Sequence, residues 1–202
     1  RRSAIYASLN WKHEDIDKFL MSKNWKDMPV GTTGQTLFDI KQDDFNFPAP
    51  LDMTNVSVNY DTEWLLNYWE TGNVGETFIS NVRQALSTAE PGFSFNFFDK
   101  ENETLRNACT EVTSEDDSDV CNLGSLNFAR IDGINQLKNI VGLATKFLIC
   151  GTLRAQLPYD KVYKVREKNR RLGLGLMGLH EWLIQRGSRY ETTEEMHRWL
   201  KV

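Results

Sequence analysis

The stretch LRNACTEV, residues 105–112, brings together three side chains that could act in one reaction. Cys109 has the amide of Asn107 two residues before it and the carboxylate of Glu111 two residues after it. In an extended backbone side chains alternate, so these three would point to the same side, with neighbours roughly 7 Å apart along the strand. The pattern predicts a thiol between a neutral hydrogen-bonding group and a proton acceptor.

Two other interpretations of Cys109 stay open at the level of this stretch. An ordinary cysteine nucleophile needs a base, usually a histidine, to form the thiolate. The histidines His13, His180 and His197 are all expected on helices far away in the chain, which does not favour a cysteine-protease site. The remaining interpretation is a small hydrophobic residue in the core, the usual fate of a cysteine.

A second cysteine, Cys121 in VCNLGSLN, follows twelve residues after Cys109. Two cysteines on neighbouring extended segments could be metal ligands, a redox pair or a coincidence. Neither has a Cys or His two to four residues away, so no metal site is expected. The acidic run between them, residues 114–119, is expected to be a solvated turn without a role. Cys150 is expected to be a structural residue on an apolar helix face.

The run GLGLMG matches the glycine pattern of a dinucleotide-binding turn at Gly173, Gly175 and Gly178. That fingerprint needs a hydrophobic strand before it and an acidic residue at the end of a second strand about 20 residues later. Here the preceding VREKNRR is strongly basic, and Glu191 and Glu194 fall at the start of an expected helix. A nicotinamide-dependent oxidoreductase is therefore an alternative, beside the simpler interpretation that the glycines let a strand and a helix pack closely.

The composition is that of an ordinary globular protein with 202 residues, a net charge of -4 and a pI near 5.5. This charge argues against a general nucleic-acid or membrane surface, and no apolar run approaches the roughly 18 residues that span a bilayer. Three cysteines suit a reducing compartment, so a cytoplasmic protein is expected. The sequence starts without Met and stops within the helical pattern EEMHRWLKV, which predicts one partial domain, 1–202, from inside a longer protein.

Hydrophobic periodicity predicts an α/β fold of which part of the sheet lies outside this sequence. Strands are expected at residues 4–10, 54–60 and 92–98, with Phe93, Phe95 and Phe97 on one face. Asp61 should cap a helix that Gly72 ends. The expected helices are 13–23, 62–70, 75–89, 134–156, 180–187 and one from about 192, and residues 24–52 are expected to be a long loop.

Four blocks, in order, resemble the large catalytic subunit of ribonucleotide reductase. They are the opening RRSAIYASLNWKHEDIDKFL, then NACTE, CNLGSLN and NRRLGLGLMGL, and together they span almost the whole chain. The resemblance implies part of a ten-stranded α/β barrel with a central finger loop that carries Cys109 at its tip. It further implies that ribonucleotides are reduced to 2′-deoxyribonucleotides for DNA synthesis.

By this resemblance Cys109 would be the thiyl-radical residue that abstracts the 3′ hydrogen of the ribonucleotide. Glu111 would take the proton of the 3′ hydroxyl, and Asn107 would hydrogen-bond the ribose. Cys121 would be one half of the dithiol that supplies the reducing equivalents. The implied substrate-binding residues are Asn107, Ala108, Cys109, Thr110 and Glu111.

Arg1 and Ala4 resemble part of the loop that sets substrate specificity. The radical would come from adenosylcobalamin in a class II enzyme, which the short gap between Cys109 and Cys121 favours, or from a separate metal-containing small subunit in class I. Expected partners are the ribonucleotide, dNTP or ATP effectors, a thioredoxin or glutaredoxin type reductant and the flanking parts of the enzyme. The second redox cysteine would precede Arg1, so this piece alone should be inactive. A non-enzyme alternative is a helical interaction domain with incidental cysteines.

Overall fold

The computed structural model describes residues 4–32, 34–98 and 104–202. Helices and parallel strands alternate along this part of the chain, which confirms the predicted α/β class. The chain divides into two compact units, Arg1–Glu115 and Asp116–Val202, each with a hydrophobic core. The single partial domain expected for residues 1–202 stays a prediction.

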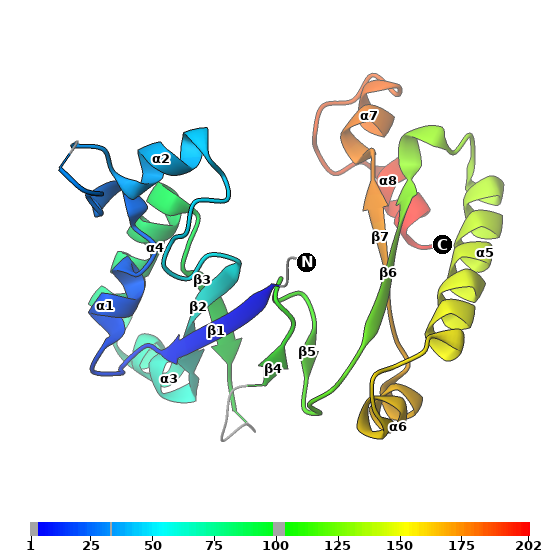
Figure 1. Ribbon diagram of the computed structural model, residues 1–202. Coiled ribbons are helices and arrows are strands. Elements are labelled where there is room, and N and C mark those ends of the chain that lie inside the picture. Colours follow the sequence, from blue (N-terminus) through cyan, green and yellow to red (C-terminus); the bar gives the residue numbers. More distant parts are fainter. Residues whose placement is uncertain (1–3, 33, 99–103) are drawn as a thin grey trace. The chain divides into compact units, whose positions relative to one another are not determined.

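The first unit contains a parallel sheet in the order β1-β2-β3. The strands β1, β2 and β3 are Ile5–Asn10, Thr54–Asp61 and Gly92–Asn96, as predicted. The helices are α1 (Ile16–Met21), η1 (Trp25–Asp27), α2 (Leu37–Asp43), α3 (Thr62–Thr71) and α4 (Glu76–Thr88). The strands β4 (Leu105–Arg106) and β5 (Thr113–Ser114) form an antiparallel hairpin. The helices α1, α3 and α4 lie on one side of the sheet, and the hairpin lies on the other (Figure 1).

The core of this unit lies between the sheet and those helices. On β2 the alternate residues Val56, Val58 and Tyr60 are buried, and Tyr60 packs on Trp64 with ring centroids 5.0 Å apart. Burial raises the pKa of Tyr60 to about 12, although Asn81 Nδ2 donates a hydrogen bond to its hydroxyl at 3.1 Å. The aromatic stripe of β3 continues the same face, because its rings stack along the strand and onto Tyr60.

The cap of α3 is confirmed. The Asp61 carboxylate accepts the backbone N–H of Trp64 at 3.2 Å, and Gly72 ends the helix in the left-handed conformation at φ 69°. The same carboxylate accepts hydrogen bonds from Asn10 Nδ2 at 2.8 Å and from Trp11 Nε1 at 3.0 Å. Asp61 therefore joins the end of β1, the end of β2 and the start of α3.

The prediction of a long loop at residues 24–52 is wrong, because the segment contains η1 and α2. Thr36 and Asp39 form a capping box that starts α2. The ammonium of Lys41 is buried and donates to the carbonyls of Phe45 and Phe47 and to Asp52. A buried lysine of this kind depends on partners that fold back from the following residues, which the local pattern does not reveal.

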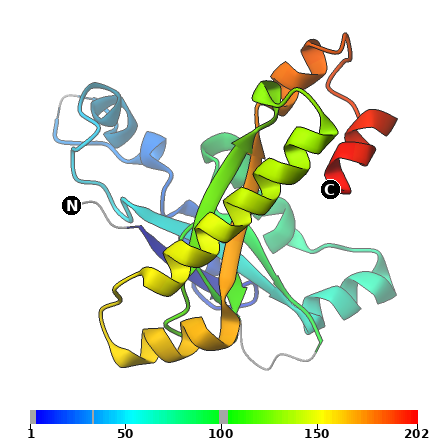
Figure 2. The ribbon, with the colours of Figure 1, turned by 90° about the vertical axis from the view of Figure 1, so that its right-hand side faces the viewer.

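The second unit is built on two parallel strands, β6 (Cys121–Asn127) and β7 (Arg171–Met177). The predicted long helix is α5 (Ile134–Arg154), which lies along both strands (Figure 2). The remaining helices are η2 (Phe128–Arg130), α6 (Asp160–Asn169), α7 (Leu179–Ile184) and α8 (Glu194–Leu200). Arg166 of α6 is buried and donates to the carbonyl of Thr152 at 3.0 Å, so α6 holds the C-terminal end of α5.

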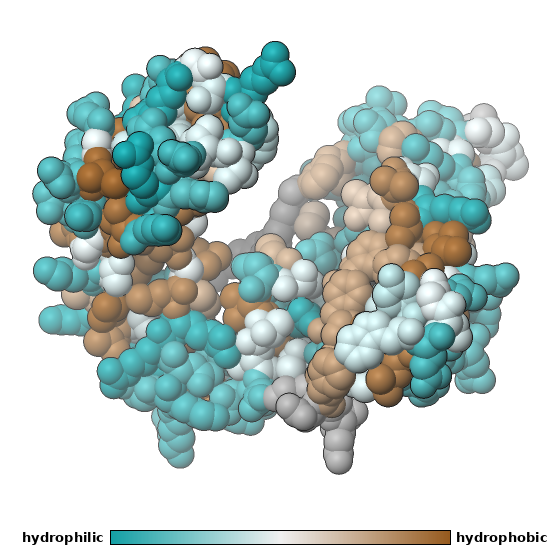
Figure 3. Space-filling model, turned by 180° about the vertical axis from the view of Figure 1, so that it is seen from behind, coloured by the Kyte–Doolittle hydropathy of each residue, from teal (hydrophilic) through white to brown (hydrophobic). Residues whose placement is uncertain are grey.

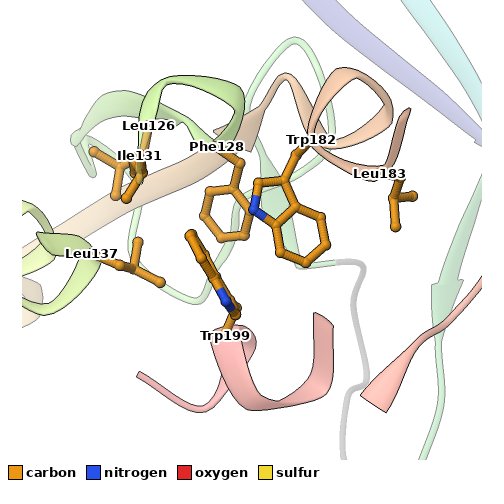
Figure 4. Close-up of a cluster of buried hydrophobic side chains, with 7 residues drawn as sticks. All are labelled: Leu126, Phe128, Ile131, Leu137, Trp182, Leu183 and Trp199. Carbon is orange, nitrogen blue, oxygen red and sulfur yellow. The ribbon is translucent and has the colours of Figure 1, made fainter. Parts of the chain in front are cut away.

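Aromatic side chains form the core of the second unit (Figure 4). Trp182 of α7 meets Trp199 of α8 edge to face at 5.0 Å, and both rings contact Phe128. Arg186 closes the cluster with its guanidinium 4.0 Å from the Trp182 ring centroid. Ring packing thus joins η2 to the helices α7 and α8, which follow it in the sequence only after α5, α6 and β7.

Apolar side chains also reach the surface among hydrophilic ones (Figure 3). On α5, Leu143 and Phe147 are 70% and 75% exposed. Within the described residues, no helix is both long enough and apolar enough to span a lipid bilayer.

The Asp61 carboxylate gives the first prediction. Burial opposes its charge, but hydrogen bonds from Asn10, Trp11 and the Trp64 N–H outweigh burial and lower the pKa of Asp61. A lowered pKa stabilises the fold above the unfolded value of about 3.9, and this stabilisation is lost as the pH falls through the folded pKa. Asp61→Ala should lower the free energy of unfolding by about 1–2 kcal/mol at pH 7, measured by urea denaturation.

Asp61→Asn is the matched control for charge. It keeps a cap oxygen for Trp64, so the difference in unfolding free energy between wild type and Asp61→Asn should shrink as the pH falls from about 6 to about 3. A difference independent of pH would contradict the charged role of Asp61.

Candidate active site

The residues around Cys109 form a tight turn between β4 and β5. The N–H of Asn107 donates to the carbonyl of Val112 at 3.3 Å, and the N–H of Thr110 donates to the carbonyl of Asn107 at 3.0 Å. Thr110 has a left-handed backbone with φ 67°. The prediction of an extended backbone here is therefore wrong. These hydrogen bonds reverse the chain direction, so the side chains of residues 107–111 do not alternate strictly.

The side chain of Asn107 closes this turn from inside. Its Oδ1 accepts the backbone N–H of Val112 at 3.2 Å. Asn107 thus fixes the shape of the turn, and its amide NH₂ is the end that can donate to a bound molecule.

The thiol and the carboxylate of the predicted set both lie at the surface of the turn. Cys109 and Glu111 are exposed, whereas Asn107, Ala108 and Thr110 are half-buried. An exposed Cys109 is not a core residue, so that interpretation is wrong. His13 precedes α1, which corrects its expected place on a helix, while His180 and His197 lie on α7 and α8.

Cys121 is the first residue of β6 and pairs in register with Arg171 of β7. It is half-buried, and its Sγ lies 3.8 Å from the carbonyl oxygen of Asn122. Cys150 lies on α5 and is exposed beside the exposed Ile149, so it contributes nothing to the core of its unit. Among the described residues, no group of three or more His, Cys, Asp or Glu side chains could hold a metal ion.

The acidic run before Cys121 was expected to be a solvated turn without a role, and this prediction is wrong. The side chain of Asp119 is only 8% exposed, and its carboxylate accepts from Arg171 Nε at 2.5 Å and from Asn169 Nδ2 at 2.8 Å. Asp116 accepts from Lys168 Nζ at 2.8 Å, and this bond, with one from Asn169, lowers the pKa of Asp116. Sequence reasoning missed this network because its basic partners come about 50 residues later, although KNRR was a visible signal.

The glycines of GLGLMG do not form a dinucleotide-binding turn. Gly173 and Gly175 lie inside β7, and a Cβ at Gly173 would lie 2.5 Å from Leu123 Cδ2 of the adjacent strand. Gly178, with φ 70°, precedes α7, and a Cβ there would lie 2.2 Å from Asn127 Oδ1. The fingerprint needs its glycines between a strand and a helix, so this geometry argues against the nicotinamide alternative. The glycines instead allow close packing, chiefly of strand on strand.

Comparison with known families decides what kind of chain carries this turn. A family model described as the barrel domain of ribonucleotide reductase matches residues 62–199, which include the turn, the acidic run and the glycines. The chain belongs to the ribonucleotide reductase family. This match and the parallel sheets confirm a fragment of the α/β barrel, while the strand number and the finger loop stay predictions.

The chain is similar to several reductases of this family. It is 27% identical over its whole length to a vitamin B12-dependent ribonucleoside-diphosphate reductase of Thermoplasma acidophilum, of which it covers 27%. It is 27% identical over 71% of its length to a ribonucleoside-diphosphate reductase subunit alpha of Synechocystis, of which it covers 20%. Over 37% of its length it is 35% identical to a vitamin B12-dependent ribonucleoside-diphosphate reductase of Mycobacterium tuberculosis. The chain thus spans about a quarter of the first relative.

The residues suggested for the specificity loop lie at the start of the chain. Arg1 lies outside the described residues, and Ala4 is the exposed residue before β1. Their role in this member of the ribonucleotide reductase family stays a prediction.

The network around Asp119 gives a second prediction. Asp119→Ala removes the acceptor of Arg171 and Asn169 and should lower the free energy of unfolding by about 2 kcal/mol, because hydrogen bonds to charged groups are the stronger ones. Asp117→Ala is the control, because its ion pair with Lys161 is exposed and worth at most about 1 kcal/mol. Urea denaturation of both variants at pH 7 measures the difference, and equal losses would contradict a structural role of Asp119.

Proposed function

We propose that this chain is part of the catalytic barrel of an enzyme that reduces ribonucleotides to 2′-deoxyribonucleotides by thiyl-radical chemistry. The observation that carries the proposal is the exposed Cys109 in a tight turn, with Asn107 and Glu111 beside it, in a chain of the ribonucleotide reductase family. A sulfur that abstracts a hydrogen atom must reach its substrate, and it needs no histidine to form a thiolate.

The Cys109 thiyl radical takes the 3′ hydrogen atom, which leaves a thiol and a substrate radical. Glu111 accepts the proton of the 3′ hydroxyl, and the 2′ hydroxyl takes a proton from the dithiol and leaves as water. Asn107 donates a hydrogen bond to the ribose through its NH₂, since its Oδ1 holds Val112. The dithiol supplies the hydrogen that replaces the 2′ hydroxyl on carbon, and Glu111 returns its proton to the 3′ oxygen. The 3′ hydrogen then returns from Cys109 to carbon, which restores the thiyl radical.

The two electrons of the reduction come from a dithiol that closes to a disulfide. We assign one of its sulfurs to Cys121 and the other to a cysteine outside this sequence. A thioredoxin or glutaredoxin type protein would restore the dithiol, and dNTP or ATP effectors would choose the substrate. This chemistry and the three cysteines suit a cytoplasmic enzyme.

We propose adenosylcobalamin as the radical source, with a separate metal-containing subunit as the alternative. Two of the relatives above are named vitamin B12-dependent, which supports the first choice. The exposure of Cys109 fits either, because the sulfur must meet a reagent from outside the turn. The cofactor, when bound, supplies the radical that removes the hydrogen atom of the Cys109 thiol.

The test uses the polypeptide completed at both ends. Reduction of CDP and CTP is measured with dithiothreitol and adenosylcobalamin for wild type, Cys109→Ser and, as a control, Cys150→Ser. We expect Cys109→Ser to lower turnover to background and Cys150→Ser to retain it, because a hydroxyl does not form the radical. The 202-residue chain alone should give no product.

The outcomes separate the alternatives. Product that appears only after a metal-loaded small subunit is added would assign the radical to that subunit instead of cobalamin. Full turnover by Cys109→Ser would disprove the radical role. If Cys109→Ala and Cys121→Ala change stability alone, the chain is a non-catalytic interaction domain.

A further inference from the structure

One face of the β1-β2-β3 sheet is polar although it is largely buried. On β2, Asn55, Ser57 and Asn59 alternate with the core residues. On β3, Ser94 is the register partner of Asn59, and Asn96 follows two residues later on the same face, level with Asp61. All of these except Asn55 are buried. Buried amides and hydroxyls are stable only with hydrogen-bond partners, so this face needs a polar cover.

The β4-β5 hairpin meets this face at its base. Asn96 Oδ1 accepts from the backbone N–H of Thr104 at 3.1 Å and from its hydroxyl at 2.8 Å. Asn96 Nδ2 is held in turn by Asn59 Oδ1 at 2.6 Å. The chain entering the hairpin is thus fixed by a side chain that is itself fixed on the sheet.

A second bond holds the tip of the hairpin. Asn55 Nδ2 donates to the carbonyl of Ala108, the residue immediately before Cys109. Asn96 is level with Asp61, six residues further along β2 than Asn55, which places the two anchors roughly 20 Å apart along the sheet. One anchor therefore fixes the base of the hairpin and the other fixes its tip.

We propose that Asn55 is a positioning residue that sets the place of the Cys109 sulfur through the Ala108 carbonyl. The inference rests on the proposed function, because the place of the sulfur matters only if the sulfur reacts. A hydrogen bond fixes both the distance and the direction between its donor and its acceptor. The exposed turn has little apolar surface, so packing contributes little to its position. The hydrogen bond from the Val112 N–H to Asn107 Oδ1 fixes the shape of the turn. The hydrogen bond from Asn55 to the Ala108 carbonyl fixes the turn to the sheet.

The test compares variants of nearly equal size. Asn55→Asp cannot donate to a carbonyl, whereas Asn55→Gln retains the donor. Asn67→Asp is the control, because Asn67 is an exposed residue of α3 away from the hairpin. Hydrogen exchange of the Thr110 and Val112 amides, measured by NMR, should be about fivefold faster in Asn55→Asp, largely restored in Asn55→Gln and unchanged in Asn67→Asp.

The completed enzyme supplies the functional readout. Asn55→Asp should lower kcat for ribonucleotide reduction about tenfold with KM unchanged, because a small misplacement of a reacting group slows the reaction. Asn55→Gln should recover most of kcat. Unchanged exchange, or faster exchange with unchanged kcat, would overturn the inference.

These results are separable from those for the proposed function. Full turnover by Cys109→Ser overturns the proposed function, whatever the exchange rates are. Loss of turnover in Cys109→Ser, together with normal kcat in Asn55→Asp, keeps the proposed function and overturns only the role of Asn55.

Discussion

The alternation of side chains along β2 is the constraint on which the first unit depends. One face carries Val56, Val58 and Tyr60 to the helices, where burial stabilises the unit. The other face carries the amides and hydroxyls of residues 55–59, and these require hydrogen-bonding partners. The hairpin that carries Cys109 meets this second face, so the same strand both builds the core and receives the candidate site.

The candidate site has the features of a reactive group held by its backbone. Cys109 is exposed, and the bonds that hold it belong to its neighbours, Ala108 and Asn107. Such an arrangement leaves the sulfur unobstructed while it limits the motion of the turn. A thiolate nucleophile would need a base beside it, whereas hydrogen-atom abstraction needs reach and position.

The second unit positions Cys121 by a different means. Asp119, two residues earlier, is held by Arg171 and Asn169, and Arg171 is the register partner of Cys121 on β7. An ion pair and a hydrogen bond thus hold the residue two positions before β6, and the glycines of β7 allow the two strands to pack closely. Membership in the ribonucleotide reductase family explains why motifs with different local roles occur together in this order.

The sequence by itself determined the features that depend on neighbouring residues, because periodicity and capping act within a few residues. These features are the strand of residues 54–60, the long helix from residue 134, and the helix that Asp61 caps and Gly72 ends. It also identified the family, which the family match confirms, whereas the reactive set around Cys109 stays a prediction. Only the tertiary structure decided the rest. The turn at Cys109 and the partners of the Lys41 ammonium involve residues no more than 11 positions apart, but hydrophobic periodicity carries no information about such backbone and side-chain hydrogen bonds. The partners of the acidic run lie about 50 residues away and meet it only in the folded chain.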